Sequence, residues 1–140
     1  MKHAQLEVLL VEDNPGDVRL VQEGLRAIGM DCGISVAEDG DRALQRLHDE
    51  ARPLPDLVLL DLNLTRVDGR RVLTEIKRDP RLRHVPVVVL TSSDAERDIA
   101  AAFDLHANAY VKKPGNLAAF LDVIASIGHF WLETSELPPH

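Results

Sequence analysis

Four apolar runs in the sequence end directly on side chains that could take part in phosphoryl transfer. The residues that follow these runs are Glu12-Asp13, Asp61, Thr91 and Lys113. Continuous runs of branched apolar residues are typical of parallel strands that are covered on both faces. Because the reactive crevice of an open parallel sheet lies beyond the carboxyl ends of its strands, we expect these side chains to meet at one edge.

Three carboxylates in one place repel one another unless they share a cation or a proton. Oxygen ligands with open coordination positions suit Mg²⁺, and an aspartate beside such a metal can act as a nucleophile and form an acyl phosphate. The hydroxyl of Thr91 and the ammonium of Lys113 would then stabilise the phosphoryl oxygens. Each residue taken singly could merely end a strand or cap the next helix, but their joint occurrence favours a phosphoryl-accepting site.

The segments between these residues predict five strands that alternate with five helices. The strands are expected at residues 6–11, 34–37, 57–60, 87–90 and 109–112. The helices are expected after Asn14-Pro15, after Asp39-Gly40, around Val72 to Ile76, at 94–105, and after Asn116 with Leu117, Phe120, Leu121, Ile124 and Ile127 inward. Right-handed crossovers place helices on both faces of a parallel sheet. We therefore predict one α/β doubly wound domain over residues 1–132 and a loosely held polar tail over 133–140.

Composition excludes several classes of function. The chain has 140 residues and a net charge of -7, which argues against non-specific binding to nucleic acid. One cysteine excludes an internal disulfide and fits a reducing compartment. No apolar run has the length that a membrane span needs, and the N-terminus lacks signal-peptide character. We expect a cytoplasmic protein without a membrane anchor.

The motifs at the strand ends form a recognisable set. They are Val11-Glu12-Asp13-Asn14, Leu60-Asp61, Asp68-Gly69, Leu90-Thr91-Ser92 and Lys113-Pro114. Together they resemble the receiver domain of two-component response regulators, from about Leu6 to Ile127. The resemblance implies the flavodoxin-like (βα)5 fold with strand order 2-1-3-4-5. It also implies a phosphoacceptor switch, which catalyses its own phosphoryl transfer and dephosphorylation and no other reaction.

The same resemblance implies a role for each site residue. Asp61 would accept the phosphoryl group from a phosphohistidine of a histidine kinase. Asp13 and Asp61 would bind Mg²⁺ directly, the backbone carbonyl of Asn63 would be a further ligand, and Glu12, where an Asp is commoner, would act mostly through water. Thr91 would hydrogen-bond the phosphoryl group and Lys113 would pair with it. Tyr110 stands where receivers carry the aromatic residue that turns inward as the threonine shifts.

A narrower set of motifs is similar to the stand-alone regulators of bacterial and cyanobacterial phytochromes. These motifs are Val11-Glu12-Asp13-Asn14-Pro15-Gly16-Asp17, Asp61-Leu62-Asn63-Leu64, Glu75-Ile76-Lys77, Asp79-Pro80 and Phe130-Trp131-Leu132. This similarity implies that the kinase partner is a bacteriophytochrome, a sensor of red light.

A second apolar stripe on the last predicted helix has no obvious partner in the core. It consists of Val123, Ile127, Phe130, Trp131 and Leu132. One interpretation is a homodimer face, toward which the phytochrome-regulator similarity also points. The alternative is that Trp131 folds back on the end of its own helix.

Two other functions fit parts of the sequence. Asp61-Leu62-Asn63-Leu64-Thr65 partly resembles the nucleophile motif of haloacid-dehalogenase-type phosphatases, but Asn63 stands where that family needs an acidic proton donor. The chain could also be a receiver-like binding module that takes no phosphate, against which the complete acceptor set argues.

Overall fold

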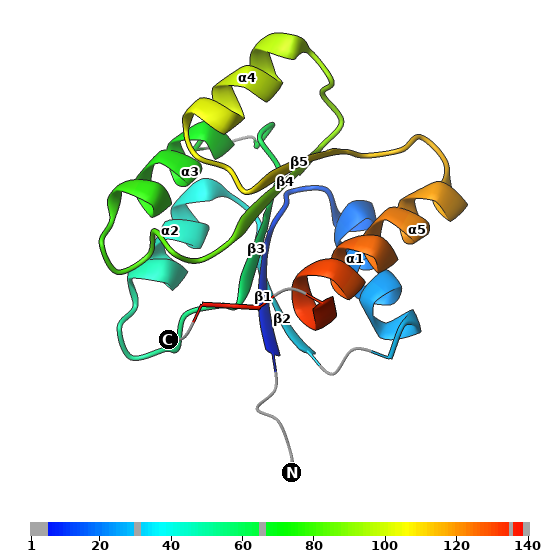
Figure 1. Cartoon of the computed structure of the whole chain (residues 1–140), viewed down its shortest axis with the longest axis horizontal. Coiled ribbons are helices and arrows are strands. Elements are labelled where there is room, and N and C mark those ends of the chain that lie inside the picture. The colour runs from blue at the N-terminus through cyan, green and yellow to red at the C-terminus, as the bar shows by residue number, and fades with distance from the viewer. Residues whose placement is uncertain (1–5, 30–31, 65–66, 135, 139–140) are drawn as a thin grey trace.

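The computed structural model describes residues 6–29, 32–64, 67–134 and 136–138. Within these ranges one parallel sheet contains β1 (Leu6–Val11), β2 (Cys32–Ala37), β3 (Leu57–Leu60), β4 (Val87–Thr91) and β5 (Ala109–Lys112). Its strand order is β2-β1-β3-β4-β5 (Figure 1). The predicted doubly wound fold and strand order are therefore confirmed. β2 begins two residues earlier than predicted, because Cys32 and Gly33 pair with Leu6 and Glu7 of β1.

The helices of the described chain are α1 (Pro15–Ala27), α2 (Gly40–His48), α3 (Gly69–Arg78), α4 (Glu96–Asp104) and α5 (Leu117–Ile127). The side chains of Asn14, Asp39, Asp68 and Asn116 each accept a backbone N–H at the start of a helix, which satisfies donors that the first turn leaves unpaired. Helix α4 lacks such a cap and starts at Glu96 rather than at the predicted Asp94. Asp94 instead pairs with Lys112 at 2.9 Å.

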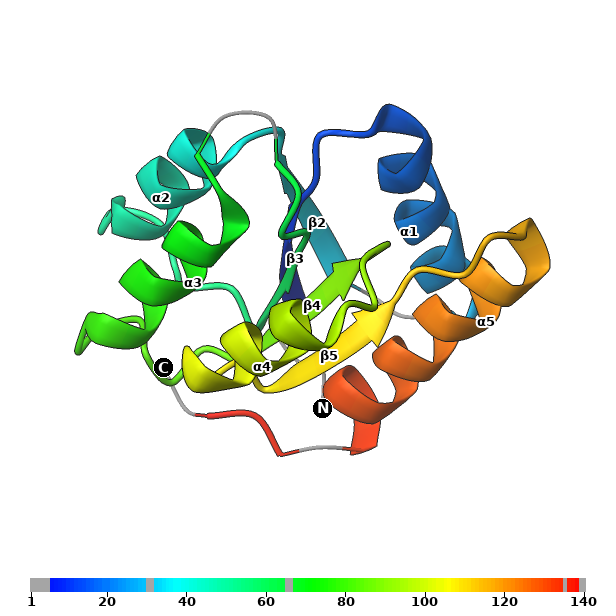
Figure 2. The same ribbon diagram turned by 90° about the horizontal axis from the view of Figure 1, so that it is seen from above.

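The helices form a layer on each face of the sheet. α1 and α5 lie side by side on one face, and α2, α3 and α4 cover the other (Figure 2). Every residue of β3 and β4 is buried between these layers, which explains why their sequences are apolar without alternation. The position of Asp61 is consequently fixed by the most deeply buried part of the sheet.

The backbone register brings the strand ends together. The Asp61 N–H donates to the Val11 carbonyl at 3.0 Å, so the residues after β3 and β1 are neighbours. The Lys113 N–H donates to the Thr91 carbonyl at 2.8 Å, which ties the ends of β5 and β4 in the same way. The predicted convergence at one edge of the sheet follows from these bonds.

The C-terminal helix differs from its prediction. The chain continues from α5 into a π-helix, Gly128–Thr134, within which the predicted domain boundary after Leu132 falls. Ile127 and Leu132 are 6% and 7% exposed in the core beneath α1 and α5, and Ile127 also lines a groove between α5 and β5. Leu117, expected inward, is 60% exposed at the first turn of α5.

Pro138 lies at the opposite edge of the sheet from Asp61. It lines a cavity with Pro53 and Pro86, which stand shortly before β3 and β4. Among the helices of the described residues, none is long and apolar enough to cross a membrane.

Candidate functional site

The side chain of Asp61 is held at both carboxylate oxygens. Oδ1 accepts the Asn63 N–H at 3.0 Å, and Oδ2 accepts from Lys113 Nζ at 3.1 Å. Burial alone would raise the pKa of Asp61, but the bonds from Asn63, Lys113 and Thr91 outweigh it and hold the pKa below its ordinary value. Asp61 is thus 7% exposed and held in its ionised form, the form in which a carboxylate can act as a nucleophile.

Gly69 lets helix α3 begin directly against the backbone of Asp61 and Leu62. A Cβ at Gly69 would lie 2.4 Å from the carbonyl oxygen of Asp61 and 2.6 Å from the Cα of Leu62. Both are backbone atoms that cannot move aside, so a larger residue would push α3 away from the end of β3. The Asp68-Gly69 motif therefore positions the loop after the acceptor strand.

Lys113 is the cation of this site. Its side chain is 9% exposed, and its ammonium donates to Glu12 at 2.6 Å, to Asp17 at 2.8 Å and to Asp61 at 3.1 Å. Burial would lower the pKa of Lys113, but these carboxylates raise it well above its ordinary range. Lys113 therefore stays charged at any physiological pH.

The acidic cluster of Glu12, Asp13 and Asp61 fits a divalent cation. One oxygen from each residue lies within 4.8 Å of the other two, and all the donors are carboxylates. Burial raises the pKa of Glu12 to about 7, in spite of its bonds to Lys113 and Asn14, which reflects the cost of a buried charge that a bound cation would relieve. The carbonyl of Asn63, the further ligand expected from sequence, belongs to the loop directly after Asp61.

Thr91 and Tyr110 lie on neighbouring strands, where Tyr110 is opposite Val89 and Thr91 is opposite Lys112. Thr91 is completely buried, and its Oγ1 accepts a hydrogen bond from the Asn63 side chain at 3.2 Å. The Tyr110 hydroxyl donates to the Ser93 carbonyl at 2.8 Å, and its ring packs on the core beneath α2, α3 and α4. The structure thus brings five predicted site residues together at the carboxyl edge, whereas Tyr110 bonds the Ser93 carbonyl instead. The five are Glu12, Asp13, Asp61, Thr91 and Lys113.

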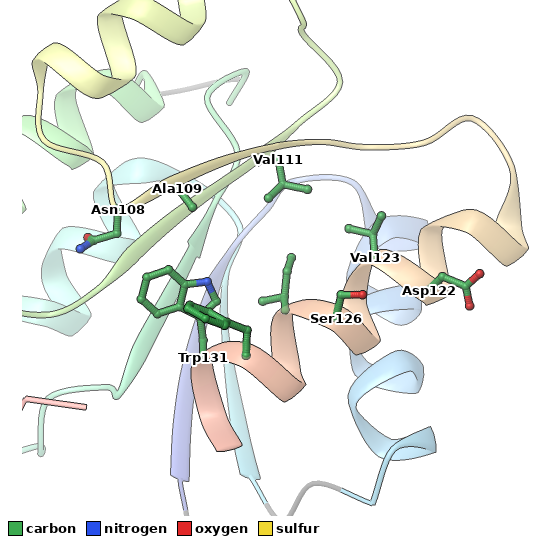
Figure 3. Close-up of a pocket in the computed structure, with 9 residues that line it drawn as sticks. Asn108, Ala109, Val111, Asp122, Val123, Ser126 and Trp131 are labelled. Atoms are coloured by element: carbon green, nitrogen blue, oxygen red, sulfur yellow. The ribbon is translucent and has the colours of Figure 1, made fainter. Parts of the chain in front are cut away.

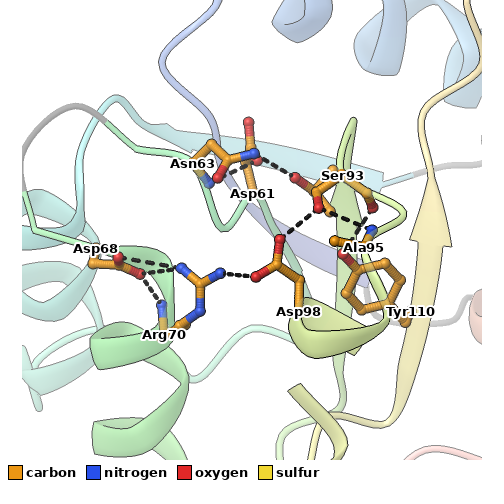
Figure 4. Close-up of polar contacts among 9 residues, drawn as sticks. Asp61, Asn63, Asp68, Arg70, Ser93, Ala95, Asp98 and Tyr110 are labelled. Carbon is orange, nitrogen blue, oxygen red and sulfur yellow. Dashed lines mark hydrogen bonds and ion pairs between the residues drawn. The ribbon is translucent and has the colours of Figure 1, made fainter. Parts of the chain in front are cut away.

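Sequence reasoning missed an ionic network that continues from this site to two helices (Figure 4). Arg70 at the start of α3 forms an ion pair with Asp98 of α4, and Asp98 accepts from the Ser93 hydroxyl at 2.5 Å. Ser93 in turn connects to Tyr110 through its carbonyl. No local motif marks this network, because its residues are distant in sequence. Asp17 belongs to the motif that is similar to phytochrome regulators, but no role was predicted for it.

Comparison with known proteins assigns the family. The response regulator receiver domain matches residues 8–125 of the chain. The chain belongs to this family.

Several individual response regulators are similar to this receiver domain in sequence and in structure. The response regulator Rcp1 of Synechocystis sp. is 45% identical over 94% of this chain and 92% of its own length. The crystal structure of the phosphorylated cyanobacterial phytochrome response regulator RcpA matches with a TM-score of 0.92 and 44% identity, over 97% of this chain and 100% of that chain. The structure of the Mn²⁺-bound form of Rcp1 matches with a TM-score of 0.91 and 45% identity, over 96% and 99% of the two chains. The receiver domain described here is thus similar to phytochrome response regulators along nearly its whole length.

Proposed function

We propose that this receiver domain is a phosphorylation-operated switch whose phosphoacceptor is Asp61. The observation that carries the proposal is the ionised, buried Asp61 carboxylate, bonded to Lys113 and adjoining the acidic cluster. The side chains that could stabilise added phosphoryl oxygens, Thr91 and Lys113, contact Asp61 already. The phosphoryl group itself carries about -1.5 to -2 charge, which would draw both side chains toward its oxygens.

The transfer exchanges one bond to phosphorus for another. An oxygen of Asp61 supplies the electron pair for the new P–O bond, while the P–N bond of a phosphohistidine breaks and its pair returns to the imidazole nitrogen. Attack by water later releases inorganic phosphate and restores the carboxylate. The chain thereby changes state and need not turn over any separate substrate, which is why we propose a switch rather than an enzyme.

We assign Mg²⁺ to the acidic cluster, with Asp13 and Asp61 as direct ligands, Glu12 acting mostly through water, and the Asn63 carbonyl as a further ligand. The all-oxygen donor set supports this choice, as does the similarity to the Mn²⁺-bound form of Rcp1. A bound Mg²⁺ would neutralise negative charge on the phosphoryl oxygens and on Asp61.

The proposed partner is a histidine kinase, specifically a bacteriophytochrome. The similarity to Rcp1 and to the phytochrome response regulator RcpA supports this choice. A cavity of about 370 Å³ beside Lys113, lined by Leu20, Leu117 and Phe120 among others, offers an apolar surface where the kinase could dock. The proposed location is the cytoplasm, where ATP supplies such kinases.

A homodimer is a further part of the proposal, with its face at the groove between α5 and β5, which Ile127 lines and Leu132 does not. Val123, Phe130 and Trp131 line an apolar groove of about 680 Å³ between α5 and β5 (Figure 3). Phe130 is 53% exposed and meets Trp131 edge-to-face, with 5.2 Å between the ring centroids. If a second copy covers this groove, Phe130→Ser should weaken dimerisation, measured by sedimentation of phosphorylated and unphosphorylated protein.

Intact mass after incubation with acetyl phosphate and Mg²⁺ tests the switch. We expect a single phosphoryl adduct that is absent from Asp61→Asn, absent with a chelator, and lost on alkaline hydrolysis as acyl phosphates are. The control is Asp104→Asn, an exposed aspartate at the end of α4, which should give the wild-type adduct. An adduct that survives Asp61→Asn would contradict the assignment. No adduct from either acetyl phosphate or a phosphorylated kinase would favour the binding module, and steady hydrolysis of a phosphomonoester would favour the phosphatase.

A further inference from the structure

One partner of the Lys113 ammonium lies outside the acidic cluster. Among the described residues, Lys113 Nζ donates to Oε1 of Glu12, Oδ2 of Asp17 and Oδ2 of Asp61. An ammonium has three protons, so these bonds use its full donor capacity. Glu12 and Asp61 belong to the acidic cluster, whereas Asp17 does not.

We propose that Asp17 is a positioning residue, which keeps the Lys113 ammonium beside Asp61 throughout the phosphorylation cycle. This role rests on the proposed function, because Asp17 would hold Lys113 while Glu12 and Asp61 bind the cation and Asp61 becomes phosphorylated.

The bonds from Lys113 to Glu12 and Asp61 are those that the cycle weakens. Oxygens that ligate a cation have fewer lone pairs left for Lys113, and the cation repels the ammonium. When Asp61 becomes an acyl phosphate, its ester oxygen also loses most of its negative charge. Neither cation binding nor formation of the acyl phosphate alters the bond from Lys113 to Asp17. It can hold the ammonium in place while a proton of Lys113 turns to a phosphoryl oxygen.

The fold fixes Asp17 for this task. Asn14 Oδ1 accepts the backbone N–H groups of Gly16 at 2.9 Å and Asp17 at 3.1 Å, which sets the first turn of α1. The side chains of Asp17 and Lys113 are 24% and 9% exposed, so solvent screens their 2.8 Å ion pair less than it screens a surface pair. A Cβ at Gly24 would lie 2.7 Å from Ile124 Cγ2, so α1 sits closely on α5. Asp17 therefore lies on a helix that packs closely on α5, the helix that follows the loop containing Lys113.

An aspartate in a first helical turn can also act merely by stabilising the helix dipole. The two roles differ in whether the effect of Asp17 passes through Lys113. A double-mutant cycle separates them, because it measures the interaction between the two residues.

The first test measures the phosphorylation rate with acetyl phosphate at saturating Mg²⁺. We expect Asp17→Asn to be about tenfold slower, less than the loss typical of removing a transition-state donor itself, with partial recovery in Asp17→Glu. Glu23→Gln removes an exposed charge from the same helix and should change nothing. Asp17→Asn should cause no further loss in a Lys113→Met background. An equal loss in both backgrounds, or faster phosphorylation of Asp17→Asn, would overturn the proposal.

The second test needs no phosphoryl transfer. The ¹⁵N spectrum of the lysine ammonium groups in Mg²⁺-loaded, unphosphorylated protein should contain a Lys113 signal in the wild type and in Asp17→Glu. In Asp17→Asn that signal should disappear through fast exchange with water. A retained signal would show that Asp17 does not hold the ammonium. If the wild type takes no phosphoryl group, the proposed function fails, while this spectrum still decides the role of Asp17.

Discussion

The carboxyl edge of the sheet and the groove between β5 and α5 differ in whether their side chains find partners within the chain. The charged side chains of the edge are paired, whereas the apolar side chains of the groove remain partly exposed. At the edge, carboxylates from α1 and from the ends of β1 and β3 share one buried ammonium. In the groove, apolar side chains of β5 and of the C-terminal helices remain partly open, with Phe130 53% exposed. At the edge, the carboxylates are paired with an ammonium of the same chain, and an added negative charge would change this pairing. The groove is completed when another apolar surface covers it. Under the proposed function, the first region would take up the phosphoryl group and the second would bind a partner.

Among the substitutions that test this difference between the two regions, loss of the Lys113 ammonium should have the largest effect. We expect Lys113→Ala to slow phosphorylation by acetyl phosphate about a hundredfold, because the donor nearest the developing phosphoryl charge is gone. Its neighbour Lys112 is exposed and bonds Asp94 instead, so Lys112→Ala should retain the wild-type rate. Equal rates for the two variants would show that the edge does not work through Lys113.

For substitutions near the groove, the loss of stability should depend on how deeply the side chain is buried rather than on its charge. Leu132→Ala should lower the free energy of unfolding by about 2–4 kcal/mol, because it leaves a cavity beneath α1 and α5. Phe130→Ala, two residues away, should change it by less than about 0.5 kcal/mol in the monomer, since that side chain is exposed. Urea denaturation at low protein concentration measures both. A large loss from Phe130→Ala there would mean that the ring belongs to the core.

Glu12 should make the metal-free protein less stable as the pH rises. Its pKa is 4.5 in the unfolded chain and about 7 in the folded one, so between these values the folded state binds more protons and stability falls with pH. Well above pH 7 Glu12 is ionised in both states, so its contribution to the change of stability with pH disappears. Glu12→Gln should remove this slope from Tm measured between pH 4.5 and 7, and Glu38→Gln, exposed after β2, should keep it. Added Mg²⁺ should flatten the wild-type curve, and an unchanged slope in Glu12→Gln would assign it to other groups.

The Arg70–Asp98 pair should have the smallest effect. Because it lies near the surface, Arg70→Gln should change Tm little. Its effect should appear in the NMR shifts of Ser93 and Tyr110, which the network joins to Asp98. Unchanged shifts at both residues would show that the pair does not influence the β4–α4 loop.

Much of the fold and the site was predictable because the signals were local. The apolar runs of β3 and β4, the caps at Asn14 and Asp39, and the polar residues after the strands each follow from neighbours in the chain. The start of α4 was less predictable, because Asp94 pairs with Lys112 from β5 instead of capping the helix. Spacing alone also could not show which side chains of the C-terminal stripe the π-helix would bury.

The sequence by itself determined the alternation of strands and helices, because burial on both faces and helix capping leave patterns in consecutive residues. Its resemblance to receiver domains implied the strand order, the family and the roles of the site residues. The tertiary structure decided how those residues are paired. Asp17, 96 residues before Lys113, became its partner, and Leu132 moved from a presumed surface into the core. Such pairings depend on how helices α1 and α5 pack on one another, and a contact between distant segments leaves no mark on the local sequence around either one.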